Sequence, residues 1–134
     1  MDDQELRDKG MQVRRAVLGE AHLQRMQDSL TPLNAEFQDL ITRYAWGEIW
    51  TRPGLPRHTR SMLTISMLVA LNREEELRMH LRAAANNGVS RDEIKEVLLQ
   101  AAIYCGVPAA NSAFKAAQEV FAAVDAEATK EGGV

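Results

Sequence analysis

The sequence predicts an all-α fold, and three observations lead to this prediction. Apolar residues recur at steps of three and four along almost the whole 134-residue chain, as they do on the buried face of an amphipathic helix. No segment shows the sustained period-two alternation of a half-buried strand. Glycine, proline and capping residues separate the periodic segments. We therefore expect one compact domain over residues 1–134, a bundle of about six helices with a flexible tail from about residue 127 to 134.

The first helix is predicted from its cap and its stop signal. Asp2 or Asp3 can accept hydrogen bonds from the first free backbone N–H groups. Gly19 can adopt the left-handed conformation that often ends a helix. The apolar face between these signals consists of Leu6, Val13 and Val17. A short second helix is expected from Ala21.

Threonine and proline mark the next two helices. Thr31 places a capping residue before Pro32 at the first helical position, so a third helix should run from here toward Trp50. The segment TRPGLP, residues 51–56, then breaks the chain. From there to about Leu71 the sequence has little polar surface, so this helix should be central and buried.

The second half of the chain contains further helix signals. The helix that carries His80 should end at Gly88, which can take the left-handed conformation of a C-terminal cap. Ser90 and Glu93 form a capping-box pattern that begins the next helix, and we expect these two helices to pack as a hairpin. Gly106 then separates a last, alanine-rich helix.

Composition and charge argue against several classes of partner. The chain has 16 Lys and Arg against 19 Asp and Glu, a net charge of -3, so it lacks the basic excess that nucleic-acid phosphates require. The longest apolar segment, SMLTISMLVAL, is about half of the ~20 residues that span a bilayer, so no membrane partner is expected. The polar, acidic start does not resemble a secretory signal, and Cys105 is the single cysteine. We therefore expect a cytoplasmic protein.

A first candidate site is the stretch YAWGEIWTRPGL, which contains both tryptophans of the chain, Trp46 and Trp50. Glu48 lies between them. A carboxylate in aromatic surroundings is desolvated, which raises its proton affinity and suits it to general acid–base catalysis. The alternative is that the tryptophans only pack one helix end onto the core.

A second candidate site is the stretch RPGLPRHTR, where Arg52, Arg57, His58 and Arg60 surround the start of a helix. Cations at this position oppose the helix dipole, so local stability does not explain them. A bound carboxylate at the free backbone N–H groups would explain them. The alternative is that these arginines pair with the acidic EEE run or with a neighbouring subunit.

A third candidate site is the stretch REEELRMHLRAAANNGVS, in which Glu76 precedes His80 by four residues. This spacing places both side chains on one helix face, where the carboxylate can orient the imidazole. A lone histidine on a helix is more often structural than catalytic, so the spacing leaves both roles open. His22 and His58 are far away in the sequence, and no motif places imidazoles on one metal ion. Tyr104, next to the lone cysteine, either packs in the core or lines a pocket.

Four parts of the sequence, taken together, resemble the carboxymuconolactone decarboxylase family. They are WGEIWTRPGL, the arginine at position 60, EELRMHLRAAANNGVSRDEIKEVL and YCGVPAANSAFKAA, in the family's order and spacing over nearly the whole chain. The resemblance implies the alkylhydroperoxidase D-like helical fold of the wider superfamily. Redox members of that superfamily carry Cys-x-x-Cys shortly before the histidine that His80 resembles. Arg73 and Glu76 occupy these two positions here, so thiol redox chemistry is excluded.

The resemblance also implies an activity: decarboxylation of 4-carboxymuconolactone to 3-oxoadipate enol-lactone and CO₂, in the protocatechuate branch of the β-ketoadipate pathway. This dicarboxylate lactone carries its own electron sink, because the electron pair left by CO₂ is delocalised through the ring double bond into the lactone carbonyl. No cofactor or metal is then required. The implied assembly is a homohexamer with active sites near the subunit interfaces.

Within this resemblance, His80 is the general acid or the donor to the developing oxyanion, with Glu76 orienting it or Glu48 sharing the proton transfer. The resemblance supports His80 most directly, whereas the role of Glu48 rests on charge and position. The two carboxylates are assigned to Arg60 and Arg52, and the apolar wall to Trp46, Trp50 and Tyr104. Two alternatives remain: a superfamily relative that acts on another small carboxylic acid or lactone, and a non-catalytic helical assembly module.

Overall fold

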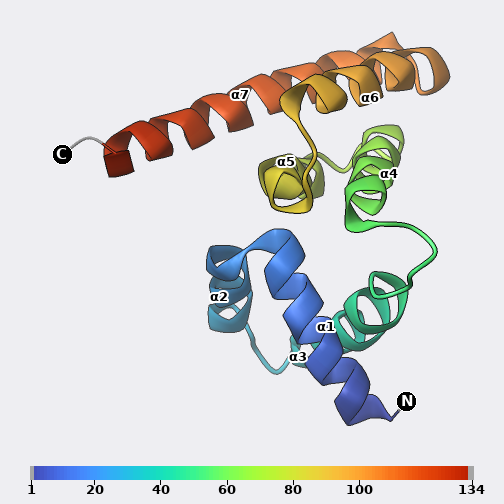
Figure 1. The fold of residues 1–134 in the computed structure, drawn as a ribbon, viewed down its shortest axis with the longest axis vertical. Coiled ribbons are helices and arrows are strands. Elements are labelled where there is room, and N and C mark those ends of the chain that lie inside the picture. The colour runs from blue at the N-terminus through green and yellow to red at the C-terminus, as the bar shows by residue number, and fades with distance from the viewer. Residues whose placement is uncertain (1, 133–134) are drawn as a thin grey trace. The chain divides into compact units, whose positions relative to one another are not determined.

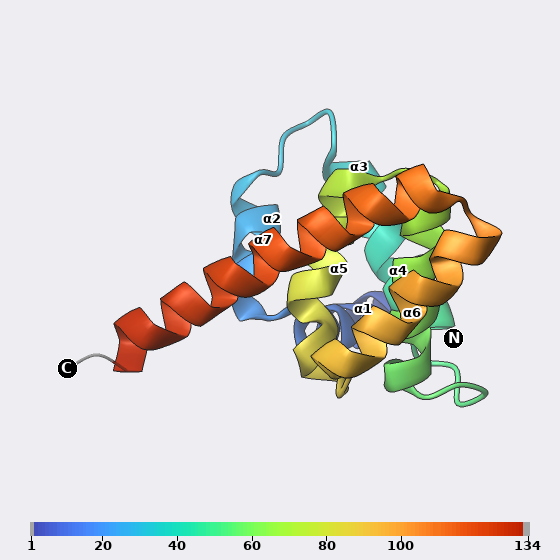
Figure 2. The ribbon, with the colours of Figure 1, turned by 90° about the horizontal axis from the view of Figure 1, so that it is seen from above.

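The computed structural model describes residues 2–132, and every regular element in this range is a helix, as Figure 1 and Figure 2 show from two directions. The all-α prediction is therefore confirmed. The described residues form two compact units, one up to Arg60 and one from Ser61 onward. Among these residues, none of the helices combines the length and the apolar character needed to cross a membrane. That the whole chain is a single domain stays a prediction.

The first unit begins with two helices, and the sequence predicted both ends of the first and the approximate start of the second. Its regular elements are α1 (Asp3–Leu18), α2 (Glu20–Asp28), α3 (Ala35–Leu40) and the π-helix η1 (Ile41–Ile49). The Asp2 carboxylate caps α1 by accepting a hydrogen bond from the backbone N–H of Glu5 at 2.8 Å. Gly19 ends α1 with a φ of 94°. The cap and the position of the stop are therefore as predicted, whereas the ψ of Gly19, 157°, lies outside the left-handed helical conformation.

The segment predicted as one helix over residues 31–50 differs from the prediction in two ways. Its first residues form a turn, because the backbone N–H of Thr31 donates to the Asn34 side-chain oxygen at 2.7 Å. Its second half is a π-helix, in which hydrogen bonds join residues five apart. The backbone N–H of Trp50, for example, donates to the carbonyl of Ala45 at 3.0 Å. π-helical turns are rare and occur frequently at functional sites.

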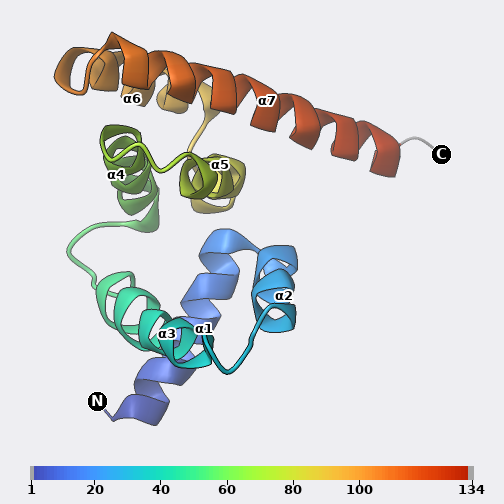
Figure 3. The same cartoon turned by 180° about the vertical axis from the view of Figure 1, so that it is seen from behind.

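α1 crosses η1 with the two backbones in direct contact, and two buried glycines permit this crossing (Figure 3). A β-carbon on Gly10 would overlap the carbonyl group of Thr42, and one on Gly47 would overlap the carbonyl oxygen of Leu6. Glycine inside a helix costs about 1 kcal/mol relative to alanine. The close approach of the backbones explains why glycine stands at both positions.

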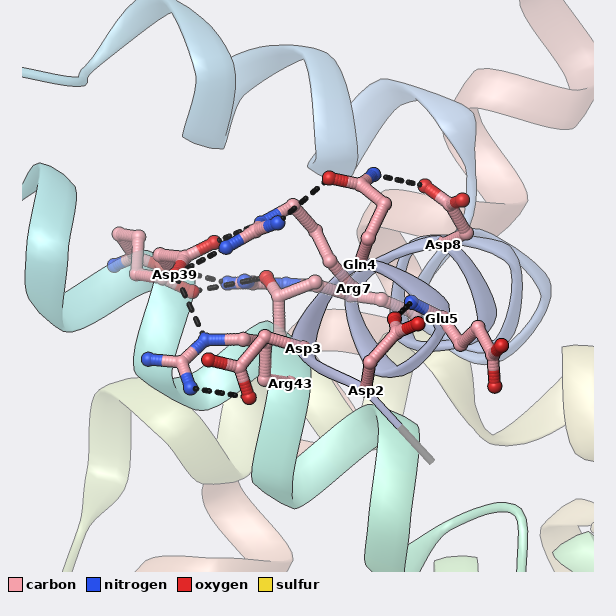
Figure 4. Close-up of polar contacts among 11 residues, drawn as sticks. Asp2, Asp3, Gln4, Glu5, Arg7, Asp8, Asp39 and Arg43 are labelled. Carbon is pink, nitrogen blue, oxygen red and sulfur yellow. Dashed lines mark hydrogen bonds and ion pairs between the residues drawn. The ribbon is translucent and has the colours of Figure 1, made fainter.

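Ion pairs near the start of α1 join the same elements (Figure 4). The Asp39 carboxylate accepts hydrogen bonds from Arg7 Nε at 2.6 Å, Arg7 Nη2 at 3.1 Å and Arg43 Nε at 2.8 Å. Arg43 Nη1 also lies 3.6 Å from the Asp3 carboxylate. The hydrogen bond from Arg7, followed by that from Arg43, lowers the pKa of Asp39 from 3.8 to about 2. Asp39 therefore links α1 to α3 and η1 in its charged form.

The second unit contains the longest helix of the chain, which packs against two others. Most of α4 (Arg57–Ala70) belongs to it, with α5 (Glu74–Ala83), the 3₁₀ helix η2 (Ala84–Asn87), α6 (Arg91–Tyr104) and α7 (Val107–Gly132). α7 contacts both α5 and α6, and it lies alongside α6 in Figure 2. The hairpin partner of α6 is therefore α7 and not the His80 helix, so this detail of the prediction was wrong. The core of the unit includes Ile65, Val69, Leu77, Leu81, Ile94, Leu98, Ala113, Ala116 and Ala117.

The end signals predicted for the second unit are present. Gly88 adopts a φ of 76° after η2. Ser90 and Glu93 form the predicted capping box, with reciprocal hydrogen bonds of 3.0 and 3.1 Å. α7 continues through residues 127–132, where the sequence predicted a flexible tail. Residues 133–134 of that tail lie outside the described range, and the mobility of the segment stays a prediction.

We expect Gly10→Ala to lower the free energy of unfolding by about 1 to 3 kcal/mol or more, because its methyl group overlaps a backbone carbonyl that cannot rotate away. Urea titration measures this change. Gly54→Ala is the matched control, since a β-carbon on Gly54 meets no atom within 4 Å and should change stability by no more than about 0.5 kcal/mol. Equal stabilities of the two variants would show that the crossing does not depend on Gly10.

The pKa of Asp39 also predicts how stability depends on pH. Because this pKa is lower in the folded state, the stabilisation is fully present above 3.8 and is lost as the pH falls through about 2. Asp39→Asn should therefore lower the free energy of unfolding at pH 7 by roughly 1 kcal/mol, a modest value because the side chain is 33% exposed. Near pH 2 the variant and the parent should converge. Asp28→Asn, an exposed aspartate of α2, is the control, and a difference that persisted unchanged at pH 2 would contradict the assignment.

Candidate active site

η1 brings the two predicted tryptophans together. The ring centroids of Trp46 and Trp50 lie 5.0 Å apart with 30° between their planes, a stacked arrangement. Trp46 is 6% exposed, whereas Trp50 is half-buried. Trp46 therefore packs in the interior, and Trp50 keeps part of its ring accessible. The pair is compatible both with packing and with an apolar wall beside a ligand.

Glu48 lies between the two tryptophans in the sequence, but it does not share their buried environment. Its side chain is exposed. The sequence predicted that this carboxylate would be desolvated, and in the single chain it is not. Trp46 and Trp50 are buried or half-buried, whereas Glu48 between them faces solvent. A desolvated Glu48 requires a bound substrate or a second copy of the chain to cover it.

Arg52 lies in the loop that precedes α4, and Arg60 lies in the first turn of α4. Arg60 Nη2 donates a hydrogen bond to the backbone carbonyl of Arg52 at 3.2 Å, so this guanidinium helps to close the loop. Arg52 is exposed and Arg60 is half-buried. α4 has no acidic residue in its first turn, so the positive end of its dipole has no acidic side chain beside it there. Arg60 therefore has a structural contact in addition to the carboxylate binding that the sequence predicted.

In the second unit, α5 carries Glu76 and His80 one helical turn apart. His80 is 7% exposed, whereas Glu76 is exposed. The small residues that follow, Ala83 and Ala84, are 2% and 1% exposed. A histidine this deeply buried is either a hydrogen-bonded part of the core or part of a site that is closed to solvent. Its burial excludes the role of an ordinary surface histidine.

Tyr104 ends α6 and is 83% exposed. Its neighbours Ile103 and Val107 are 80% and 70% exposed, so the tyrosine belongs to an apolar surface. A side chain this exposed does not line a pocket in the single chain. The predicted role of Tyr104 in an apolar wall stays a prediction.

The first unit also contains an open hollow of about 660 Å³. It is lined by Ala35, Glu36, Phe37, Asp39, Leu40 and Arg43. None of the predicted site residues lines this hollow. Its apolar part, Phe37 and Leu40, is exposed at 59% and 45%, so the hollow is an open surface feature and not an enclosed pocket.

Other groups that could support chemistry are dispersed. Within residues 2–132, no three side chains of His, Cys, Asp or Glu are grouped so that they could hold a metal ion. Cys105 is a free, half-buried thiol. Burial, followed by the nearby charges of Arg14 and Arg25, lowers the pKa of His22. His22 is therefore neutral at physiological pH, and it adds no second acid–base pair.

The sequence did not predict a role for Arg14. Its side chain is 5% exposed and lies on the buried face of α1 between Val13 and Val17. The signal was present, because an arginine occupied an apolar position of an otherwise amphipathic helix. This signal indicates that the side chain is buried, but it does not identify the partners of the guanidinium.

Comparison with known proteins shows which family this sequence matches and which proteins it is similar to. Residues 35–119 match the carboxymuconolactone decarboxylase family, and this segment contains all the predicted site residues. The chain is 54% identical over 121 residues to a 4-carboxymuconolactone decarboxylase of Acinetobacter baylyi, covering 90% of each chain. It is 45% identical over 101 residues to a nitrosuccinic acid decarboxylase of Metarhizium robertsii, covering 75% of this chain and 71% of the relative. A 4-carboxymuconolactone decarboxylase of Pseudomonas putida is 54% identical over 48 residues, 36% of this chain and 100% of that sequence.

The all-helical fold and the family match define the class of protein together. The chain belongs to the carboxymuconolactone decarboxylase family. The resemblance drawn from the sequence blocks and the alkylhydroperoxidase D-like helical fold that it implied are confirmed. The roles assigned to individual site residues stay predictions.

We expect His80→Ala to reduce turnover of the lactone that the resemblance implies by roughly 10²-fold or more, the usual contribution of general acid–base catalysis. The helical circular dichroism signal should be kept. His80→Gln separates two roles, because an amide can donate a hydrogen bond to an oxyanion but cannot deliver a proton. If Gln restores most of the rate, His80 is an oxyanion donor and Glu48 becomes the better candidate for the acid.

The matched control is His22→Gln, the same exchange at a half-buried histidine of the first unit. This variant should keep the parent's rate. A folded His80→Ala variant with a rate within a few-fold of the parent would show that His80 is structural.

Proposed function

We propose that the protein catalyses the cofactor-independent decarboxylation of 4-carboxymuconolactone to 3-oxoadipate enol-lactone and CO₂ in protocatechuate catabolism. The observation that carries this proposal is the 54% identity over 90% of both chains to a relative with that activity in its name. The location of every predicted site residue within the family segment supports it. The protein is thus proposed to be a carboxy-lyase.

The substrate supplies the electron sink for this reaction. The bond between the ring carbon and the leaving carboxylate breaks, and its electron pair passes through the ring double bond to the lactone carbonyl oxygen. The resulting furanolate then takes a proton at the ring carbon next to the carbonyl, which gives the enol-lactone. The protein must hold the leaving carboxylate perpendicular to the ring, stabilise the oxyanion and deliver the proton.

We assign each of these tasks to particular residues of the candidate site. His80, buried and one turn after Glu76, is the proposed acid or oxyanion donor, and Glu48 shares the proton transfer. Arg52 and Arg60 bind the two carboxylates of the substrate. The apolar wall, where the departing carboxylate loses solvation, consists of Trp46, Trp50 and Tyr104.

The proposed assembly is a homohexamer, and exposed apolar side chains support it. Monomeric proteins rarely leave large contiguous apolar surfaces in water. Three groups of large apolar side chains are at least 40% exposed: Leu33, Phe37, Leu40 and Tyr44; Leu63, Met67 and Leu71; Ile103, Tyr104 and Val107. Contacts between copies of the chain would bury these groups and would also cover Tyr104. The cytoplasmic location that we propose rests on the lone, free cysteine.

A second candidate substrate is nitrosuccinic acid, because the chain is 45% identical to a decarboxylase named for it. Both molecules contain the same fragment: a carbon that carries the leaving carboxylate, a carboxymethyl arm and an electron-withdrawing group. The electron sink is the conjugated lactone in one and the nitro group in the other. One pair of carboxylate-binding arginines can therefore serve both substrates.

The test is to supply purified protein with 4-carboxymuconolactone and, separately, with nitrosuccinic acid, and to follow CO₂ release and the organic product. We expect the lactone to give the higher kcat/KM, with activity unchanged by EDTA because the substrate accepts the electrons itself. Turnover of nitrosuccinic acid alone would favour the second candidate, and turnover of neither would overturn both. Loss of activity in EDTA that one metal restores would contradict the mechanism.

The same preparation tests the assembly. Sedimentation at micromolar concentration should show a hexamer that carries the activity. A monomer that is fully active would contradict both the assembly and the covering of site residues by a second copy.

A further inference from the structure

The π-helix η1 is supported at both ends by threonine hydroxyls. Thr42 Oγ1 donates to the backbone carbonyl of Gln38 at 2.9 Å, and Thr51 Oγ1 donates to that of Gly47 at 2.6 Å. π-helices occur mostly as single turns within α-helices, whereas η1 extends over 9 residues. An uncommon backbone conformation of this length persists only when surrounding contacts stabilise it. The contacts that stabilise η1 therefore decide where its side chains point.

Arg14 makes the contact that spans the beginning of η1. Its Nη1 donates to Thr42 Oγ1 at 3.1 Å and its Nη2 donates to Gln38 Oε1 at 2.8 Å. Gln38 belongs to α3 and Thr42 to η1, so the planar guanidinium bridges the step at which the α-helix becomes a π-helix. A lysine ammonium does not present this pair of parallel donors.

The surroundings of Arg14 make a purely stabilising role unfavourable. Both of its acceptors are neutral oxygens, its Nε has no hydrogen-bond partner, and no carboxylate in residues 2–132 forms an ion pair with it. Burial lowers the pKa of Arg14. A buried charge without a counter-charge costs free energy, so packing alone would favour an apolar residue here.

We propose that Arg14 is a positioning residue for the candidate active site, because it sets the hydrogen-bond register in which η1 presents Trp46, Glu48 and Trp50. Without the bridge, residues 41–49 can return to the commoner α-helical register. That change would rotate Trp50 relative to Trp46 and would displace Glu48 with it. Arg14 forms no hydrogen bond or ion pair with these three residues and acts through Thr42 and Gln38. The expected effect of Arg14 on catalysis rests on the proposed function, whereas its effect on the register of η1 does not.

Two pairs of variants distinguish the effect of the Arg14 hydrogen bonds from the effect of a change in packing. Arg14→Met removes the donors, and Arg15→Met is its control at the next position, where the exposed Arg15 pairs with Glu20 at 2.7 Å. Thr42→Val removes the hydroxyl at almost constant shape, and Thr42→Ser is its control because it keeps the hydroxyl. The chain has only 2 tryptophans, so the exciton couplet of the stacked indoles in circular dichroism reports on η1 alone.

We expect Arg14→Met and Thr42→Val to lose the couplet and to lower kcat by about tenfold to 10²-fold, the effect of displacing groups by roughly 1 Å. KM should change less, because the carboxylate-binding arginines lie outside η1. Arg15→Met and Thr42→Ser should keep both the couplet and kcat.

A folded Arg14→Met variant with an unchanged couplet would overturn the proposal, as would a lost couplet with unchanged kcat. If Arg14→Met does not fold, the exciton couplet and the kcat of Thr42→Val test the proposal instead. If the parent protein turns over neither candidate substrate, the proposed function fails, while the couplet still decides whether Arg14 sets the register of η1.

Discussion

The first unit depends on the direct contact between the backbones of α1 and η1. Gly10 and Gly47 make this contact possible, because any side chain at either position would overlap a carbonyl group of the other helix. Once the backbones are this close, polar side chains of α1 reach acceptors on the facing elements. Arg7 reaches Asp39, and Arg14 reaches the hydroxyl of Thr42. Under our proposal for Arg14, the register of the π-helix also depends on this crossing, because the crossing brings Arg14 within reach of Thr42.

The two units are stabilised by different interactions, and this difference has consequences for stability. The second unit has a core of leucine, isoleucine, valine and alanine, with the small residues of α7 allowing close approach of α5 and α6. Its ion pairs, such as Arg91 with Asp125 at 2.8 Å and Arg82 with Glu127 at 2.8 Å, are exposed and contribute little. The first unit has fewer large apolar contacts and relies on partly buried polar groups. Acid should therefore weaken the first unit through Asp39 before it affects the packing of the second.

The sequence predicted the local features of the fold and missed those that depend on tertiary contact. The cap at Asp2 and the capping box at Ser90 were predictable, because each involves residues a few positions apart. The π-helix was not predictable, since the same residues favour an α-helix until α1 lies against them. Glu48 shows the same limit for the site: its neighbours in sequence are aromatic, yet its side chain is exposed. The contacts of Arg14 were not predictable, because its two acceptors lie 24 and 28 positions away in the sequence.

In the proposed reaction the substrate accepts its own electrons, so the protein has to orient the carboxylate, stabilise the oxyanion, deliver one proton and exclude water. A carboxylate leaves as neutral CO₂ more readily where water is excluded, so the site must be closed around it. In the single chain, His80 and Trp46 are buried, but Glu48 and Tyr104 are exposed. In the proposed hexamer, a second copy would cover Glu48 and Tyr104. Under that arrangement assembly and catalysis are coupled, because dissociation would rehydrate the groups that must be dry when the carboxylate departs.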